Sequence, residues 1–319
     1  MSVTALSPAP NPKEKRKVTF DEMITHLEGK NILFNIISKE EAKNILEYSN
    51  YMYKVTAYRK NFYQDRAGNY RDLEFGMLND LATIDMRLRY LVLQMSLDIE
   101  HSLKTKILAD ITNDPNEDGY SIVKDFLHHD NSCIDDYMHP MSRQSHYNYG
   151  LYTKHHNNPP VWVLFEVITF GTFVKFVEFY YLYKGKSRKY EDLYKILRYV
   201  KNIRNSAAHN NPMLIDIISK QLNVPITFPI TSFVKKIRTI SNDVRRKRLS
   251  NRKVHDLTAL FYVYDKYITS EPMKKIRYND LNSLLNRCLR YKEHYSKHDG
   301  LVSIYKYFSK IIDFLNNRV

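Results

Sequence analysis

The sequence predicts a mostly α-helical protein, and three observations support this fold class. Only 8 of the 319 residues are glycine, whereas turn-rich β folds use more. Residues that suit helices, such as leucine, lysine and glutamate, are frequent. Apolar residues recur at steps of three and four along several segments, and no alternating pattern is sustained long enough to indicate a sheet.

Two helix starts are marked near the N-terminus. Thr19 with Glu22, and Ser38 with Glu41, match the capping box, a reciprocal pairing of side chains and backbone amides in the first helical turn. Helices are therefore expected from about residue 20, and from about residue 39 through residue 46. The stretch 51–76 is rich in tyrosine and phenylalanine and contains a Gly-Asn turn signal, so an irregular segment is expected there.

A long helix is expected over 80–111, where apolar residues keep a spacing of three and four until Asn113-Asp114-Pro115. Residues 113–158 are polar and rich in histidine, which indicates an insertion with one short helix near 122–127. The histidines and Cys133 match no closed set of four zinc ligands, so no metal and no other cofactor is expected.

Further helices are expected in the second half of the chain. Pro159-Pro160 opens an apolar helix, because proline is favoured in a first turn. The next helix runs from about residue 190 to residue 209 and is followed by Pro212. After Pro229 the sequence becomes basic, and helical patterns return at 255–269, 277–294 and 301–316.

These patterns divide the chain into three parts. Residues 1–17 are basic and proline-rich and are expected to form a flexible tail. Residues 18–215 form a helical core that contains the polar insertion at about 113–158, and residues 216–319 form a basic helical C-terminal region. The N-terminus has no apolar signal core, and no run of about 18 uncharged apolar residues occurs. A cytoplasmic protein with no membrane partner is therefore expected.

The charge balance predicts a nucleic-acid partner. The chain has 49 lysines and arginines against 35 acidic residues, a net charge of +14. Codon bias explains abundant lysine and tyrosine, but it does not explain the shortage of acids. A basic strip near residues 235–253 is a candidate for binding phosphates, and a solvated helix face is the alternative. The strip consists of Lys235, Lys236, Arg238, Arg245, Arg246, Lys247, Arg248, Arg252 and Lys253.

The candidate reactive residues lie together in the segment Lys201–Asn210. Asn205 and His209 are four residues apart, so they share one face of the expected helix. Arg204 lies at the edge of the apolar stripe, about 140° from His209 on an ideal helix. The two side chains can converge on one ligand if the arginine wraps round, if the helix end distorts, or if a second chain contributes a copy.

These residue types suit the cleavage of RNA. An imidazole titrates near neutrality and can take the proton from a ribose 2′-hydroxyl as that group attacks the adjacent phosphorus. A guanidinium can grip the phosphate with two donors, and an amide can orient either group. A histidine at a helix end near a proline can also be a simple capping or packing residue.

Four segments resemble known families. The segment Arg204–His209 resembles the Arg-x4–6-His signature of HEPN ribonucleases. The segments Tyr53–Phe62 and Pro160–Gly171 resemble the AbiD/AbiF-type abortive-infection family, and the second is the more specific. The segment Asp98–Lys104 resembles the Glu-x3-Lys/Arg element of an earlier HEPN helix. The four occur in the family's order and cover roughly residues 18–215.

The resemblance implies a HEPN-type helical bundle, here with helical N-terminal and C-terminal extensions. It implies a metal-independent endoribonuclease toxin of phage defence, often a homodimer, whose product is a 2′,3′-cyclic phosphate. It also implies a structured non-coding RNA partner that acts as guide, antitoxin or regulator. It implies that Arg204 and His209 are catalytic residues supported by Asn205, and that Glu100 and Lys104 support the structure of the site. The alternative for the last two is an ordinary surface pair at i,i+4.

Two rival functions remain open at this point. The chain is either a nuclease or a non-catalytic RNA-binding protein that keeps the HEPN fold and forms a ribonucleoprotein with a non-coding RNA. A weaker third reading is a DNA-binding regulator that uses the basic C-terminal third.

Overall fold

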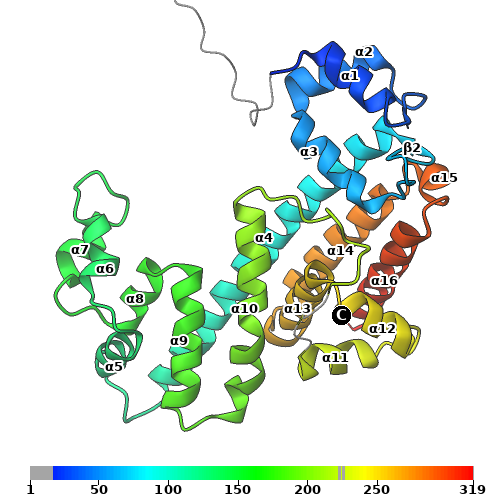
Figure 1. The fold of residues 1–319 in the computed structure, drawn as a ribbon. Coiled ribbons are helices and arrows are strands. Elements are labelled where there is room, and N and C mark those ends of the chain that lie inside the picture. The colour runs from blue at the N-terminus through cyan, green and yellow to red at the C-terminus, as the bar shows by residue number, and fades with distance from the viewer. Residues whose placement is uncertain (1–16, 222–223, 225–226, 319) are drawn as a thin grey trace, which may run out of the picture.

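The computed structural model describes residues 17–221, 224 and 227–318, and it is mostly α-helical, as the sequence predicts (Figure 1). The expected tail lies outside the described residues except for Lys17. In the described ranges, the sheet consists of two short parallel strands, β1 (Ile32–Leu33) and β2 (Leu73–Glu74). Helices therefore form the core and position every candidate site residue.

The first two helices begin at the predicted capping boxes. Helix α1 (Phe20–Glu28) starts where the Thr19 hydroxyl accepts from the backbone amide three residues on, at 3.2 Å. Helix α2 (Lys39–Asn44) starts in the same way at Ser38 and continues as a π-helix over 45–49. The region expected to be irregular contains helix α3 (Met52–Ala57) followed by a 3₁₀ turn over 58–61.

Helix α4 (Phe75–Thr112) is the spine of the molecule and joins its two ends (Figure 1). Its 38 residues correspond to a length of about 57 Å. It ends as predicted before Asn113, but it begins five residues earlier than residue 80. Gly76 permits this early start, because a β-carbon there would lie 2.6 Å from the Ile36 side chain.

Two hydrophobic cores form along this spine. The smaller core contains α1, α3 and the first turns of α4. The larger core surrounds the rest of α4 and includes helices from both the middle and the C-terminal part of the chain. Leu214 and Leu301 pack against both cores, so the two cores are joined by side chains as well as by α4.

The stretch 113–158 contains more helix than the sequence predicts. Helix α5 (Ser121–Asp130) covers the expected short helix, and α6 (Asp135–Met138), a 3₁₀ turn over 139–141 and α7 (Tyr149–His155) follow it. The apolar helix after Pro160 is divided at residues 168–169 into α8 (Val161–Val167) and α9 (Phe170–Tyr183).

The remaining helices complete the larger core. Helix α10 (Arg188–Ala208) packs against α4, α9 and α13 (Arg252–Tyr267). Around them lie α11 (Phe228–Lys235), α12 (Asn242–Leu249), α14 (Glu271–Arg287), α15 (Lys292–Tyr295) and α16 (Asp299–Asn316). Helices α11, α12, α13, α14 and α16 thus share one core with α4 and α10.

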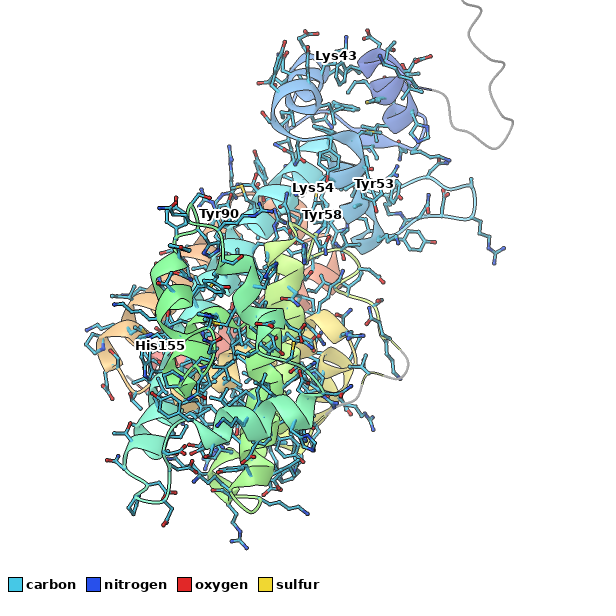
Figure 2. All side chains as sticks on the ribbon, turned by 90° about the vertical axis from the view of Figure 1, so that its left-hand side faces the viewer. Lys43, Tyr53, Lys54, Tyr58, Tyr90 and His155 are labelled. Atoms are coloured by element: carbon cyan, nitrogen blue, oxygen red, sulfur yellow. The ribbon has the colours of Figure 1, made fainter. Side chains whose placement is uncertain are left out.

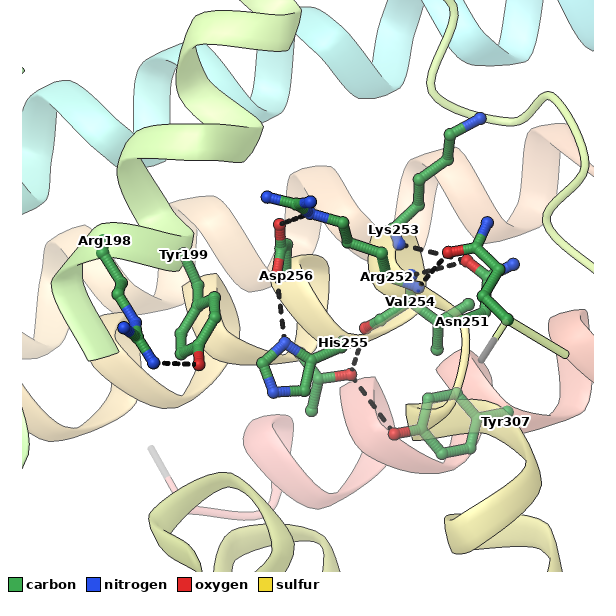
Figure 3. A network of polar contacts seen from close by, with 11 residues as sticks. Arg198, Tyr199, Asn251, Arg252, Lys253, Val254, His255, Asp256 and Tyr307 are labelled. Atoms are coloured by element: carbon green, nitrogen blue, oxygen red, sulfur yellow. Dashed lines mark hydrogen bonds and ion pairs between the residues drawn. The ribbon is translucent and has the colours of Figure 1, made fainter. Parts of the chain in front are cut away.

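A buried polar network lies where α10 meets α13 (Figure 3). The His255 side chain is fully buried, and its Nδ1 lies 3.0 Å from Oδ1 of Asp256. The Tyr199 ring stands edge-on to the imidazole with centroids 4.6 Å apart, and its hydroxyl accepts from Arg198 at 2.7 Å. Burial raises the pKa of the Asp256 carboxyl.

The chain that leaves α10 is held in place by side chains from several elements. We call residues 213–217 the anchored segment. Asp85 of α4 accepts from the backbone amides of Met213 at 2.7 Å and Leu214 at 2.6 Å. Asn61 donates to the Leu214 carbonyl at 2.7 Å and accepts from the Ile217 amide at 2.9 Å. These bonds satisfy backbone groups that would otherwise be buried without partners.

The C-terminal region holds the same segment from the other side. Asn251 donates to the carbonyl of Asp216 at 2.9 Å, and the ammonium of Lys253 donates to the carbonyl of Ile215. Asp85 itself is fully buried and is paired with Arg89, which is 3% exposed. The anchored segment therefore links the N-terminal elements, α4 and α13.

None of the helices in the described part of the chain combines the length and the apolar character that a membrane span requires.

Replacing Asp85 with alanine is expected to lower the free energy of unfolding by about 3–5 kcal/mol, because it leaves the Arg89 charge buried without a partner. Urea unfolding followed by circular dichroism measures the change. Asp313→Ala, an exposed position on α16, is the matched control and should change stability by less than about 0.5 kcal/mol. Equal stability of the two variants would contradict the role assigned to Asp85.

Candidate functional site

The C-terminal end of α10 has a defined geometry. His209 is the C-cap residue, and Asn210 follows it in the left-handed conformation with φ of 56°. The amide of Asn210 donates to the Ala207 carbonyl at 3.0 Å, and the amide of Asn211 donates to the Ser206 carbonyl at 2.9 Å. This pair of bonds is the Schellman motif, and asparagine tolerates the left-handed position in it. The helix end is therefore fixed, and the His209 side chain is exposed.

Arg204 and Asn205 lie together one turn before this end. The Arg204 guanidinium is partly buried, and its Nη1 donates to Oδ1 of Asn205 at 3.2 Å. The same guanidinium lies 6.0 Å from the centroid of the Phe170 ring, in the first turn of α9. The backbone amide of His209 donates to the Asn205 carbonyl at 3.0 Å. Arg204 is thus directed toward α9.

The structure does not bring the His209 imidazole into contact with Arg204. Among the described residues, no hydrogen bond or ion pair of the His209 side chain is found. Arg204 therefore reaches the face that Asn205 and His209 share through its bond to Asn205, and not through a bond to His209.

Glu100 and Lys104 form an ion pair on α4. Their charged atoms are 2.8 Å apart, and both side chains are mostly buried, at 16% and 18% exposed. Lys104 also donates to the Phe165 carbonyl at 2.5 Å, in the last turn of α8. Because the last carbonyls of a helix lack partners within the helix, Lys104 caps α8. The pair lies on one helix, is mostly buried, and makes a tertiary contact with α8 through Lys104.

Phenylalanines connect these two groups of residues. The Lys104 ammonium lies 5.6 Å from the centroid of the Phe173 ring. Phe173 packs edge-on against Phe165 and contacts Phe170, the residue beneath Arg204. Arg204 and the Glu100–Lys104 pair are therefore connected through the corner between α8 and α9, which the Pro160–Gly171 segment forms.

A second polar cluster lies beside the anchored segment and was not predicted. Lys54 is 7% exposed, and burial together with the nearby Arg89 charge lowers the pKa of its ammonium. The Tyr58 hydroxyl is buried without a hydrogen-bond partner within the described chain, and burial raises its pKa. Figure 2 labels both side chains where the chain of α3 approaches α4. Both residues belong to the Tyr53–Phe62 segment, and the family resemblance of that segment was the sequence signal that could have pointed to them.

The basic strip divides into exposed and buried residues. Arg248 is 4% exposed and donates to the Ser303 hydroxyl at 2.7 Å, and burial lowers the pKa of its guanidinium. Lys253 is partly buried on the Ile215 carbonyl, and burial lowers its pKa too. Arg245 is also partly buried. The exposed members are Lys235, Lys236, Arg238, Arg246, Lys247 and Arg252.

The histidines of the 113–158 stretch are mostly engaged in packing. The His129 ring packs against Phe179, and the His155 ring stands edge-on to Trp162. His156 contacts the Tyr152 carbonyl at 2.9 Å. Over the described ranges, no group of three or more histidine, cysteine or acidic side chains is placed to hold a metal ion.

The fold is that of a mostly helical protein in which Arg204, Asn205 and His209 lie at the end of the central helix α10. The chain belongs to the Abi-like protein family, whose model matches residues 44–214. The match spans α3 to α10 and ends within the anchored segment, so it contains both the α10 end and the corner between α8 and α9. Membership indicates a role in abortive infection, a defence against phage. No curated protein and no solved structure matches the chain.

The division of the basic strip gives a stability test. Arg248→Ala is expected to lower the free energy of unfolding by about 2–4 kcal/mol, because it removes a buried side chain and its bond to Ser303. Arg246→Ala should change it by less than about 0.5 kcal/mol, since that side chain is 83% exposed. Thermal and urea unfolding measure both, and a harmless Arg248→Ala would show that this arginine is not a structural residue.

Proposed function

We propose that this protein is a HEPN-type endoribonuclease toxin of an abortive-infection system that cuts RNA without a metal ion. The observation that carries the proposal is the fixed end of α10. There Arg204 is held by Asn205 and Phe170, while His209 remains exposed one turn later. Residues 18–215 are the proposed catalytic core, and residues 216–319 are its RNA-binding extension. We place its action in the cytoplasm.

The proposed reaction uses the 2′-hydroxyl of the substrate as the nucleophile. His209 takes the 2′ proton while the 2′ oxygen attacks the phosphorus and the bond from phosphorus to the 5′ oxygen breaks. The departing 5′ oxygen takes a proton from an imidazolium, and the product carries a 2′,3′-cyclic phosphate. Arg204 binds the phosphate and stabilises the charge that develops on it.

Two features of the site support a homodimer as the active form. The exposed His209 and the partly buried Arg204 form no hydrogen bond with each other within one chain, and in this proposal a second copy of the α10 end supplies the complementary residue. The exposure of the α10 end leaves it accessible to such a copy. Glu100 and Lys104 act in this proposal as positioning residues, because they hold the end of α8 and, through the phenylalanines, the ring beneath Arg204.

We also propose that the exposed members of the basic strip bind the backbone of a structured non-coding RNA, which serves as guide, antitoxin or regulator. Lys235 and Lys236 lie at the end of α11, and Arg246 and Lys247 lie in the last turn of α12. Such residues bind phosphates irrespective of sequence.

One observation favours a second function. No carboxylate or carbonyl orients the His209 imidazole in the described chain, although general acid–base catalysis benefits from such a partner. A non-catalytic RNA-binding protein with the same fold would need only exposed basic residues and a fixed α10 end.

The nuclease proposal predicts a sharp loss of cleavage in two variants. His209→Ala should lower the rate of RNA cleavage at least about 10²-fold, and Arg204→Ala about 10²–10³-fold, with folding unchanged. Purified protein is assayed on total RNA in the presence of EDTA, the 3′ ends are tested for cyclic phosphate, and growth is followed on expression. His26→Ala, an exposed histidine on α1, is the control and should cut like wild type. Cleavage or toxicity that survives His209→Ala would refute the proposal and favour the RNA-binding alternative.

The RNA-binding proposal is tested through salt dependence. The double substitution of Arg246 and Lys247 by alanine should weaken the binding of RNA that copurifies with the wild-type protein. It should reduce the slope of log affinity against log salt by about 0.7–0.9 for each lost phosphate contact. Alanine at Lys124 and Lys154, two exposed lysines outside the strip, is the charge-matched control. An unchanged slope would remove the strip from the RNA interface, and a preference for duplex DNA over structured RNA would favour a DNA-binding regulator.

A further inference from the structure

A large apolar cavity lies among helices α4, α13, α14 and α16. Its volume is about 360 Å³, and its wall is almost entirely aliphatic and aromatic. Representative lining residues are Leu88, Leu257, Phe261, Leu284, Leu285 and Ile304. It lies in the C-terminal part of the larger core and is separate from the α10 end and from the basic strip.

The mouth of this cavity is marked by the lining residues that are exposed. These are Leu289, Lys292, Ser296 and Lys306, from α15, α16 and the connections before and after α15. Within the described chain, neither lysine forms an ion pair or a side-chain hydrogen bond. Two free positive charges therefore stand at the entrance to an apolar chamber.

This arrangement indicates a ligand of a particular chemistry. The space is partly open to solvent, and its wall is apolar. Its volume is within the range of small-molecule pockets, which are mostly apolar with a few placed polar groups. An apolar chain would fill the chamber, and an anionic head would meet Lys292 and Lys306.

We propose that the cavity binds a free fatty acid, with its acyl chain between α4, α13, α14 and α16 and its carboxylate at Lys292 and Lys306. The inner wall includes Leu214 and Ile217 of the anchored segment. A bound acyl chain thus contacts the segment that fixes the end of α10. Binding itself does not depend on the proposed ribonuclease activity.

Calorimetric titration of the purified full chain with dodecanoate, below its micellar concentration, tests the proposal. Wild type should bind saturably and melt at a higher temperature when the fatty acid is present. The double variant Lys292→Gln with Lys306→Gln should bind dodecanoate at least about tenfold more weakly, because a charged hydrogen bond is lost. The same variant should bind 1-dodecanol as wild type does. Lys275→Gln, an exposed lysine on α14 outside the cavity wall, is the matched control.

A second variant fills the chamber. Leu284→Trp should abolish binding of both dodecanoate and dodecanol, with the fold checked by circular dichroism. If that variant does not fold, the lysine pair alone decides the result. The proposal is overturned if wild type shows no saturable binding, or if the lysine double variant binds dodecanoate with wild-type affinity. Binding to anionic lipid vesicles without binding to free dodecanoate would likewise overturn it, in favour of a membrane surface.

Discussion

The buried carboxylate of Asp85 is the interaction on which most of this structure depends. A charge inside a protein is costly unless it is paired and hydrogen-bonded, and here Arg89 and two backbone amides meet that requirement. The same contacts tie the chain to the spine helix α4 at Met213 and Leu214, four and five residues after His209. The position of the α10 end therefore depends on the buried Asp85–Arg89 ion pair, which is not part of the proposed catalytic residues.

Much of the fold could be predicted from local patterns. The capping boxes at Thr19 and Ser38 and the stop signal at Asn113 are short-range effects, and the helices begin and end there. The early start of α4 could not be predicted, because it depends on the close approach of Gly76 to Ile36. The helices in the aromatic 51–76 region and in the polar insertion are stabilised by tertiary packing, which periodicity does not reveal.

The candidate site, like the fold, could be predicted only in part from the sequence. Helix geometry places Asn205 and His209 on one face with Arg204 apart from them, but the long Arg204 side chain reaches Asn205 and donates to it. The roles of Asp85 and Asn61 could not be predicted from the sequence, because their partners lie 128–129 and 153–156 residues away, respectively. A run of basic residues also cannot show which members are buried. Arg248 and Lys253 form hydrogen bonds inside the protein, while Arg246 and Lys247 are exposed to solvent.

The anchored segment has a consequence for the order in which the molecule matures. A ribosome completes α10 well before it makes Asn251 and Lys253, which hold residues 215 and 216 from the far side. The nascent chain therefore carries the α10 end without its full set of anchors until α13 has emerged. Contacts across such long sequence separations also form late in folding. A growing or prematurely ended chain thus lacks two of the contacts that hold the segment after α10, although it already contains the residues whose local bonds end the helix.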